Sequence, residues 1–440
     1  MRRWILALAG SGVVWTAALA ADPAPDAGAS EPESTSSDGN DDDDEERVTG
    51  KKPPALPSTP VPELDPDWEK QREGMTKQDY IDQPYDNVSY IGAAALDMHP
   101  EFVHLIRQGL ELLYERNYNG ARDYFEGLEK RYPNTGVAGV VDTLIWQALM
   151  LENFDYKYDK QYWVSTKRAR ADLDTALEVE GNEAWEHFLY GGVLGIEAIH
   201  TMRKSQYLQA LQLAFSAMDH IQKSSELAPD FTDQKLADGM YHYWRTVVTM
   251  NSKVLPDFGD HRVQGLEEMQ EVEARGVFLA APATLSLAFS WIEEGNYKLA
   301  NVACIKNRRR YPDNIVNNLV TGSVFIYQKK YTSALGVYDE ILQDDPTNRR
   351  VHYWRGLALM RSGHPEQAKA AFETYLNSEY LESYQKSYTH YRLGQVAARQ
   401  KDWPTAVAQY TASVKEDGHK GAKKALDRLK QDKKAGKIDY

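Results

Sequence analysis

The chain has 440 residues, a formal net charge of −14, 26% charged residues and 42% hydrophobic residues. A single compact core rarely grows beyond about 250–300 residues, so we expect several domains or one elongated array. The acidic balance argues against nucleic acid as the main partner, because binding the phosphate backbone needs a cationic surface. The only cysteine is Cys304, so no intrachain disulfide is possible.

Residues 1–20 have the pattern of an export signal peptide. Arg2 and Arg3 precede an apolar stretch over 4–19, and Ala18-Leu19-Ala20 has the small-x-small form of a cleavage site. Small and polar residues interrupt a stretch already short for a stable membrane span, so we expect cleavage, with an uncleaved anchor as the alternative. The sequence therefore predicts an exported, periplasmic protein of the bacterial envelope. No later run of 18 apolar residues follows, which predicts no membrane span after cleavage.

Residues 21–62 are predicted to form a disordered acidic and Pro-rich linker. Aromatic residues are absent there, so the cost of ordering the segment cannot be offset by burial. Asp41–Glu46 is an unbroken run of six acids, without the spaced ligands and turn glycine of a calcium loop. Two interpretations stay open for this run: it contacts Arg361, Arg392, Arg399 and the basic last helix, or it is only solvated.

The next elements are predicted from helical periodicity. A lead-in helix and extended segment over 65–100 precede a repeat at 102–135. Irregular helical pairs, interpreted as degenerate repeats, fill 136–280, with an enlarged pair near 183–228. A second irregular pair is interrupted near 254–260, because Pro256 and Gly259 break a helix.

Residues 281–314, 315–348 and 349–382 repeat with a period of 34 residues. Each has a small residue, a second small residue twelve positions later, and an aromatic or compact apolar residue four positions further. The same offsets occur in 102–135 and, shifted by four residues, in 387–420, and a thin apolar stripe predicts a capping helix at 420–434. The predicted repeat-packing residues are Gly109, Ala121, Phe125, Ala288, Ala300, Cys304, Gly322, Ala334, Tyr338, Gly356, Ala368, Phe372, Gly394, Ala406 and Tyr410.

This pattern resembles the tetratricopeptide repeat (TPR). The resemblance implies an all-α fold, a right-handed α-solenoid of helix–turn–helix repeats whose first helices line a concave groove for a protein or peptide. The positions that would face the groove are Phe289, Ile292, Glu293, Ser323, Tyr327, Tyr353, Trp354, Arg361, Tyr391, Arg392, Gln395 and Arg399. The alternative for Tyr353 and Trp354 is packing between neighbouring repeats. One TPR subfamily clamps a C-terminal carboxylate with first-helix lysines and asparagines, and the matching positions here lack them.

No catalytic residue, metal site or cofactor is predicted. Nucleophile elbows, phosphate-binding loops and zinc motifs are absent, and Glu197 with His200 supplies only two ligands on one helical face. We therefore expect a non-enzymatic scaffold that binds a peptide or protein of the cell envelope, of unspecified oligomeric state. Two alternatives remain: a periplasmic helical enzyme or solute-binding protein using the irregular middle region and the 256–262 loop, or a regulatory subunit anchored by an uncleaved N-terminal helix.

Overall fold

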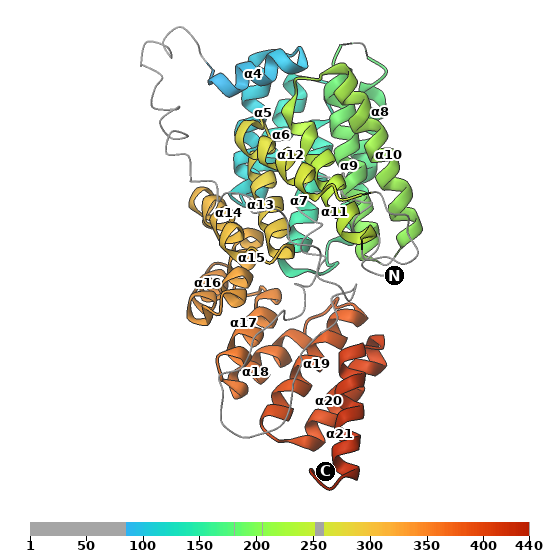
Figure 1. The fold of residues 1–440 in the computed structure, drawn as a ribbon. Coiled ribbons are helices and arrows are strands. Elements are labelled where there is room, and N and C mark those ends of the chain that lie inside the picture. Colours follow the sequence, from blue (N-terminus) through green and yellow to red (C-terminus); the bar gives the residue numbers. More distant parts are fainter. Residues whose placement is uncertain (1–84, 180, 205, 251–258, 440) are drawn as a thin grey trace. The chain divides into compact units, whose positions relative to one another are not determined.

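The computed structural model describes residues 85–439, except 180, 205 and 251–258 (Figure 1). The described backbone consists of α-helices and one short 3-10 helix, and it contains no strand, which confirms the all-α prediction. The predicted signal peptide and the linker over 21–62 lie outside the described residues. Among the helices that are described, none combines the length and the apolar character needed to cross a membrane.

The described residues divide into two compact units. Unit 1 comprises 85–148 and 159–314, and unit 2 comprises 149–158 and 315–439. Helix α7 contributes to both units, since residues after Ala148 group with unit 2. The helices up to this boundary are α4 (Asn87–Leu96), α5 (Pro100–Tyr114), α6 (Tyr118–Arg131), α7 (Val137–Asn153), α8 (Asp159–Ala176), α9 (Glu183–Arg203), α10 (Tyr207–Leu227), η1 (Thr232–Gln234), α11 (Lys235–Thr249), α12 (Arg262–Arg275), α13 (Ala280–Glu293) and α14 (Tyr297–Arg310).

Unit 1 consists of helical pairs of unequal length. Helices α5 and α6 pack as one pair and α13 and α14 as another, with 14 or 15 residues in each helix. Helices α9 and α10 have 21 residues each and pack on each other along their length. Asp233, in η1, accepts hydrogen bonds from the backbone N–H groups of Val277, Phe278 and Leu279, which satisfies donors that precede α13.

Unit 2 is a regular series of pairs. Its helices are α15 (Ile315–Tyr327), α16 (Tyr331–Asp344), α17 (Arg350–Arg361), α18 (Pro365–Leu376), α19 (Ser383–Arg399), α20 (Trp403–Asp417) and α21 (Lys420–Lys434). A capping box starts α19, where Glu382 and Gln385 each bond the other's backbone N–H. The segment 149–158 belongs to this unit: the Gln385 amide donates to the Phe154 carbonyl at 3.0 Å, and Asn348 donates to the Glu152 carbonyl at 3.1 Å.

The repeat period arises from a contact between a glycine and an aromatic ring within each pair. A Cβ on Gly356 would lie 2.7 Å from the ring of Phe372, and one on Gly394 would lie 2.5 Å from the ring of Tyr410. A Cβ on Gly322 would overlap the ring of Tyr338 in the same way. In 281–314 the two positions hold Ala288 and Cys304, both fully buried. A first helix that carries a Cβ is thus matched by a smaller side chain on the second helix.

Glu186, in the first turn of α9, is buried although its carboxylate Oε2 has no hydrogen-bond partner among the described residues. Burial, with a smaller contribution from Glu183, raises the pKa of Glu186 to about 7. A raised carboxyl pKa means that stability is highest when the group is protonated and falls as pH rises from about 4.5, the unfolded value, through about 7.

We therefore expect Glu186→Gln to increase the free energy of unfolding by about 1–3 kcal/mol at pH 8, and by much less at pH 4.5, since a unit of pKa shift corresponds to about 1.4 kcal/mol. Urea unfolding at both pH values measures this difference. Glu183→Gln, exposed in the same helical turn, is the control and should stay within about 0.5 kcal/mol of the parent. A Glu186→Gln effect that is the same at both pH values would contradict the assignment.

Candidate functional site

The first helices of successive pairs in unit 2 are neighbours. Helix α15 contacts α17, α17 contacts α19, and α19 contacts α21. Residues that the sequence places at corresponding first-helix positions of 349–382 and 387–420 therefore come close together in space. This brings Arg361, at the end of α17, into the neighbourhood of Arg392 and Arg399 on α19.

We call Arg361, Arg392 and Arg399 the arginine cluster. The Arg399 guanidinium Nη1 donates to the Met360 carbonyl at 3.0 Å, which fixes Arg399 beside the last turn of α17. Burial lowers the pKa of Arg361 to about 9, and the positive charges of Arg392 and Arg399 add to the effect. The cluster is therefore a concentration of positive charge, and an anion placed there would reduce the repulsion among its members.

The side chain of Arg392 is held in place by neighbours on its own helix. Its Nη1 donates to the Gln395 amide oxygen at 2.8 Å, and the Gln395 Nε2 donates to the Tyr391 hydroxyl at 3.1 Å. Tyr391 in turn stacks on the His419 ring with centroids 4.4 Å apart. Tyr391, Arg392 and Gln395 thus form one connected set, and this set restricts the conformations that the Arg392 guanidinium can adopt.

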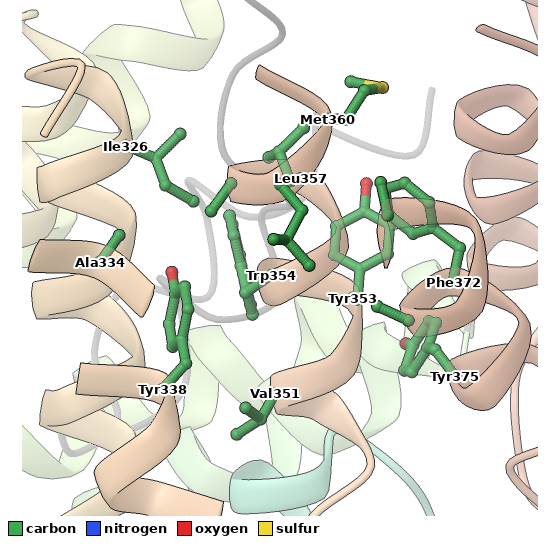
Figure 2. Close-up of a cluster of buried hydrophobic side chains, with 14 of the residues drawn as sticks. Ile326, Ala334, Tyr338, Val351, Tyr353, Trp354, Leu357, Met360, Phe372 and Tyr375 are labelled. Atoms are coloured by element: carbon green, nitrogen blue, oxygen red, sulfur yellow. The ribbon is translucent and has the colours of Figure 1, made fainter. Parts of the chain in front are cut away.

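Tyr353 and Trp354 lie in the hydrophobic core of unit 2, each 4% exposed (Figure 2). Tyr353 packs on the rings of Phe372 and Tyr375, with centroids 5.8 and 5.4 Å away. The buried Arg350 guanidinium lies 4.3 Å from the Phe154 ring centroid and 5.6 Å from that of Trp354. These positions match the packing alternative that the sequence left open for Tyr353 and Trp354. Sequence reasoning did not single out Arg350, because its aromatic neighbours come from two distant segments.

The other predicted groove residues are spread over both units. Ser323, on α15, is buried, and its hydroxyl donates to the Val320 carbonyl at 2.7 Å, while Tyr327 on the same helix is partly buried. Phe289, Ile292 and Glu293 lie on α13 in unit 1 and are partly buried. The structure therefore brings together the α17 and α19 members of the predicted groove, and it places the α13 members in the other unit.

The predicted repeat-packing residues are all buried. In each pair the small residue of the second helix has 0% exposure: Ala121, Ala300, Ala334, Ala368 and Ala406. Their aromatic or compact partners four positions later are 0–4% exposed. Complete burial of an alanine leaves room for the facing helix to approach closely, as the sequence pattern requires.

Unit 1 contains a pocket of about 400 Å³ that sequence reasoning did not identify. It is lined by Arg170, Tyr190, Leu194, Gln209, Gln212, Leu213, Ser216 and His220, which come from α8, α9 and α10. Tyr190 and His220 stack almost parallel at 4.3 Å, and the Nδ1 atoms of His220 and His187 are 2.9 Å apart. Arg170 already bonds Glu197 at 3.3 Å, so the pocket offers little net positive charge to a ligand.

The residues considered for metal or substrate binding have structural partners. His200 Nε2 and Lys204 both contact Asp159, each at 2.6 Å. No group of three or more His, Cys, Asp or Glu side chains in the described part of the chain is arranged to hold a metal ion. In the 256–262 loop, residues 256–258 lie outside the described residues, and Asp260 bonds the Arg262 guanidinium at 2.8 Å.

Comparison with known proteins gives a family match on the unit 2 repeats. Residues 325–390 match the family model described as tetratricopeptide repeat. A search of curated proteins finds no significant match.

Among solved structures, a double mutant of MamA is 19% identical over 35% of this chain and 84% of its own, with a TM-score of 0.30. The TPR domain of P58(IPK) is 12% identical, covering 77% of this chain and all of its own, with a TM-score of 0.25. The Cut9–Hcn1 hetero-tetramer of the APC/C is 11% identical, covering 80% and 94%, with a TM-score of 0.25.

The matched segment starts within α15 and ends within α19, and it includes the whole pair α17–α18. The glycine–aromatic contacts recur there at the 34-residue spacing that the sequence repeats. Together, the family match and these contacts identify the chain as a tetratricopeptide-repeat protein.

Proposed function

We propose that this protein is a non-enzymatic scaffold that binds an acidic peptide segment of a partner protein at the arginine cluster of unit 2. The tetratricopeptide-repeat fold is in general a protein–protein interaction scaffold. The observation that carries the proposal is the gathering of Arg361, Arg392 and Arg399 on two neighbouring first helices.

The chemistry of the cluster supports an acidic partner. An arginine guanidinium binds a carboxylate through paired hydrogen bonds, and such charge-assisted bonds are stronger than neutral ones. The Arg392 guanidinium is held by Gln395 next to Tyr391, so less side-chain freedom is lost when a ligand binds. Tyr391 and Arg392 are also the residue types that dominate binding hot spots.

We further propose that the partner belongs to the bacterial cell envelope and that the scaffold acts in the periplasm. This part of the proposal rests on the export signal that the sequence predicts over 1–20. The acidic balance of the whole chain would itself repel an acidic partner at long range. The arginine cluster would then select the docking site by local charge.

Replacing two members of the cluster is expected to abolish most of the affinity for an acidic peptide. The probe is a capped, fluorescein-labelled hexaglutamate peptide, compared with hexaglutamine by fluorescence anisotropy. For Arg392→Gln with Arg399→Gln we expect hexaglutamate to bind about 10–100-fold more weakly, since hydrogen bonds to charged groups contribute about 1.5–3 kcal/mol each.

Arg355→Gln is the matched control, because Arg355 is on the same helix as Arg361 but pairs with Asp339 at 2.9 Å. Its affinity for hexaglutamate should stay within about twofold of the parent. Circular dichroism checks that each variant keeps its helix content. Equal affinity of the parent for hexaglutamate and hexaglutamine would overturn the proposal.

A further inference from the structure

We propose that the acidic run Asp41–Glu46 of the same chain occupies the arginine cluster when no partner is bound, and competes with the partner for it. This inference rests on the proposed function, since it assigns an internal competitor to the same site. Its two components are six consecutive acids in the N-terminal sequence and three clustered arginines in unit 2.

The charge pattern of the run fits the cluster. Asp41–Glu46 is the longest uninterrupted run of acids in the chain, and it carries the carboxylates that arginine side chains bind in pairs. The cluster is positive because Arg361, Arg392 and Arg399 lie close enough to influence each other's charge. Hydrogen bonds from Arg392 to Gln395 and from Arg399 to Met360 leave both guanidinium groups further donors for a carboxylate, since arginine has five N–H donors.

The length of the chain permits an intramolecular contact. Residues 47–84 separate the acidic run from Tyr85, and these 38 residues reach at most about 125–135 Å when fully extended. A segment tethered in this way meets a site on its own molecule at an effective concentration of about 1 mM. Even a weak interaction would then occupy much of the cluster at low ionic strength, and salt would release it.

The experiment compares the full chain with a variant in which the run is neutral. The variant is D41N/D42N/D43N/D44N/E45Q/E46Q, and the probe is a capped, fluorescein-labelled Asp-Asp-Asp-Asp-Glu-Glu peptide. We expect the neutral variant to bind the probe about 3–10-fold more tightly than the parent at about 20 mM salt, with the difference vanishing at about 0.5 M salt.

Two further chains complete the comparison. In the Arg392→Gln/Arg399→Gln background, neutralising the run should change the probe affinity by less than about 1.5-fold, because no cluster remains to be released. The matched control neutralises five scattered acids of the same linker, D22N/D26N/E31Q/E33Q/D38N, and it should also change the affinity by less than about 1.5-fold.

The outcomes separate this inference from the proposed function. Equal affinity of parent and neutral variant, with loss of binding in Arg392→Gln/Arg399→Gln, would overturn the competition and leave the scaffold proposal standing. A scattered-acid control as effective as the neutral run would also overturn it, since diffuse charge would then suffice. So would a difference that grows with protein concentration, because the occupant would be a second copy. Failure of every chain to bind the probe would contradict the proposed function itself.

Discussion

Replacing Gly322 by alanine is expected to lower the free energy of unfolding of unit 2 by about 2–4 kcal/mol, as overpacking of a rigid core costs about 1–3 kcal/mol and sometimes more. Gly322 lies in α15, and a Cβ there would overlap the ring carbons and hydroxyl of Tyr338 on α16. Both residues are buried, and the Tyr338 ring belongs to the central hydrophobic cluster of the unit (Figure 2). The ring cannot move away without displacing its neighbours, so the two helices must separate.

Gly336→Ala is the matched control for this prediction. Gly336 lies in the interior of α16, in the same pair, but a Cβ there would have nothing within 4 Å. Alanine in an exposed helix interior stabilises by about 0.5–1 kcal/mol relative to glycine. The same substitution, 14 residues apart, should therefore change stability in opposite directions when measured by urea unfolding. Equal changes for Gly322→Ala and Gly336→Ala would contradict the proposed steric cause.

The natural Ala288–Cys304 combination suggests how the Gly322 substitution can be relieved. Adding Tyr338→Cys to Gly322→Ala removes the ring that the new Cβ would overlap. We expect a coupling energy of about 1–3 kcal/mol between the two substitutions, so that the double variant is more stable than the sum of the single effects predicts. The Tyr338 hydroxyl has no hydrogen-bond partner among the described groups, so removing it leaves no acceptor or donor unsatisfied. Simple additivity would show that the two positions do not interact.

The repeats could be predicted from sequence because their period depends on contacts within one pair. Gly356 and Phe372 are 16 residues apart and meet in a single helical hairpin, so the spacing alone encodes the contact. The prediction of groove residues required more information. Tyr353 and Trp354 occupy first-helix positions, but they pack in the core of unit 2 with Arg350 and Phe154, and Phe154 is almost 200 residues away in sequence. No local pattern announces such a neighbour.

The unit 1 pocket illustrates the same limit. Its lining comes from three helices, and the stacked Tyr190 and His220 are 30 residues apart in helices longer than the standard repeat. The arginine cluster was partly accessible to sequence reasoning, because the repeat register placed Arg361, Arg392 and Arg399 on first helices. The register could not indicate that Gln395 and Tyr391 hold Arg392, since that arrangement depends on side-chain conformation.

The second large effect is expected at Arg262, whose replacement by methionine should lower the free energy of unfolding by about 3–5 kcal/mol, the usual cost of removing one partner of a buried ion pair. The Arg262 side chain is 1% exposed. Its Nη1 donates to both oxygens of Glu294 at 3.0 Å, and its Nε and Nη2 donate to Asp260 at 3.0 and 2.8 Å. Methionine fills a similar volume but leaves two carboxylates without the cation that compensates their desolvation.

The pH dependence of the Arg262→Met effect distinguishes lost charge from lost packing. Burial raises the pKa of Glu294, and Arg262 opposes that rise. Without the arginine the pKa of Glu294 should rise further, so the folded variant loses stability as pH increases above the unfolded value of about 4.5. We therefore expect the variant to be destabilised more at pH 8 than at pH 5 in urea unfolding. A destabilisation that does not depend on pH would indicate a packing effect instead.

Removing the second charge should restore part of the loss. In Arg262→Met with Glu294→Gln, the carboxylate is replaced by a neutral amide whose oxygen can still accept from the Tyr243 hydroxyl, now at 3.0 Å from Glu294 Oε1. We expect the double variant to recover about 1–3 kcal/mol relative to Arg262→Met, since an uncompensated buried charge costs more than a buried amide. Arg275→Met, exposed on the same helix, should stay within about 0.5 kcal/mol of the parent. If the double variant is no more stable than Arg262→Met, the stabilisation comes from how Arg262 packs between α11, α12 and α13, and its charge contributes little.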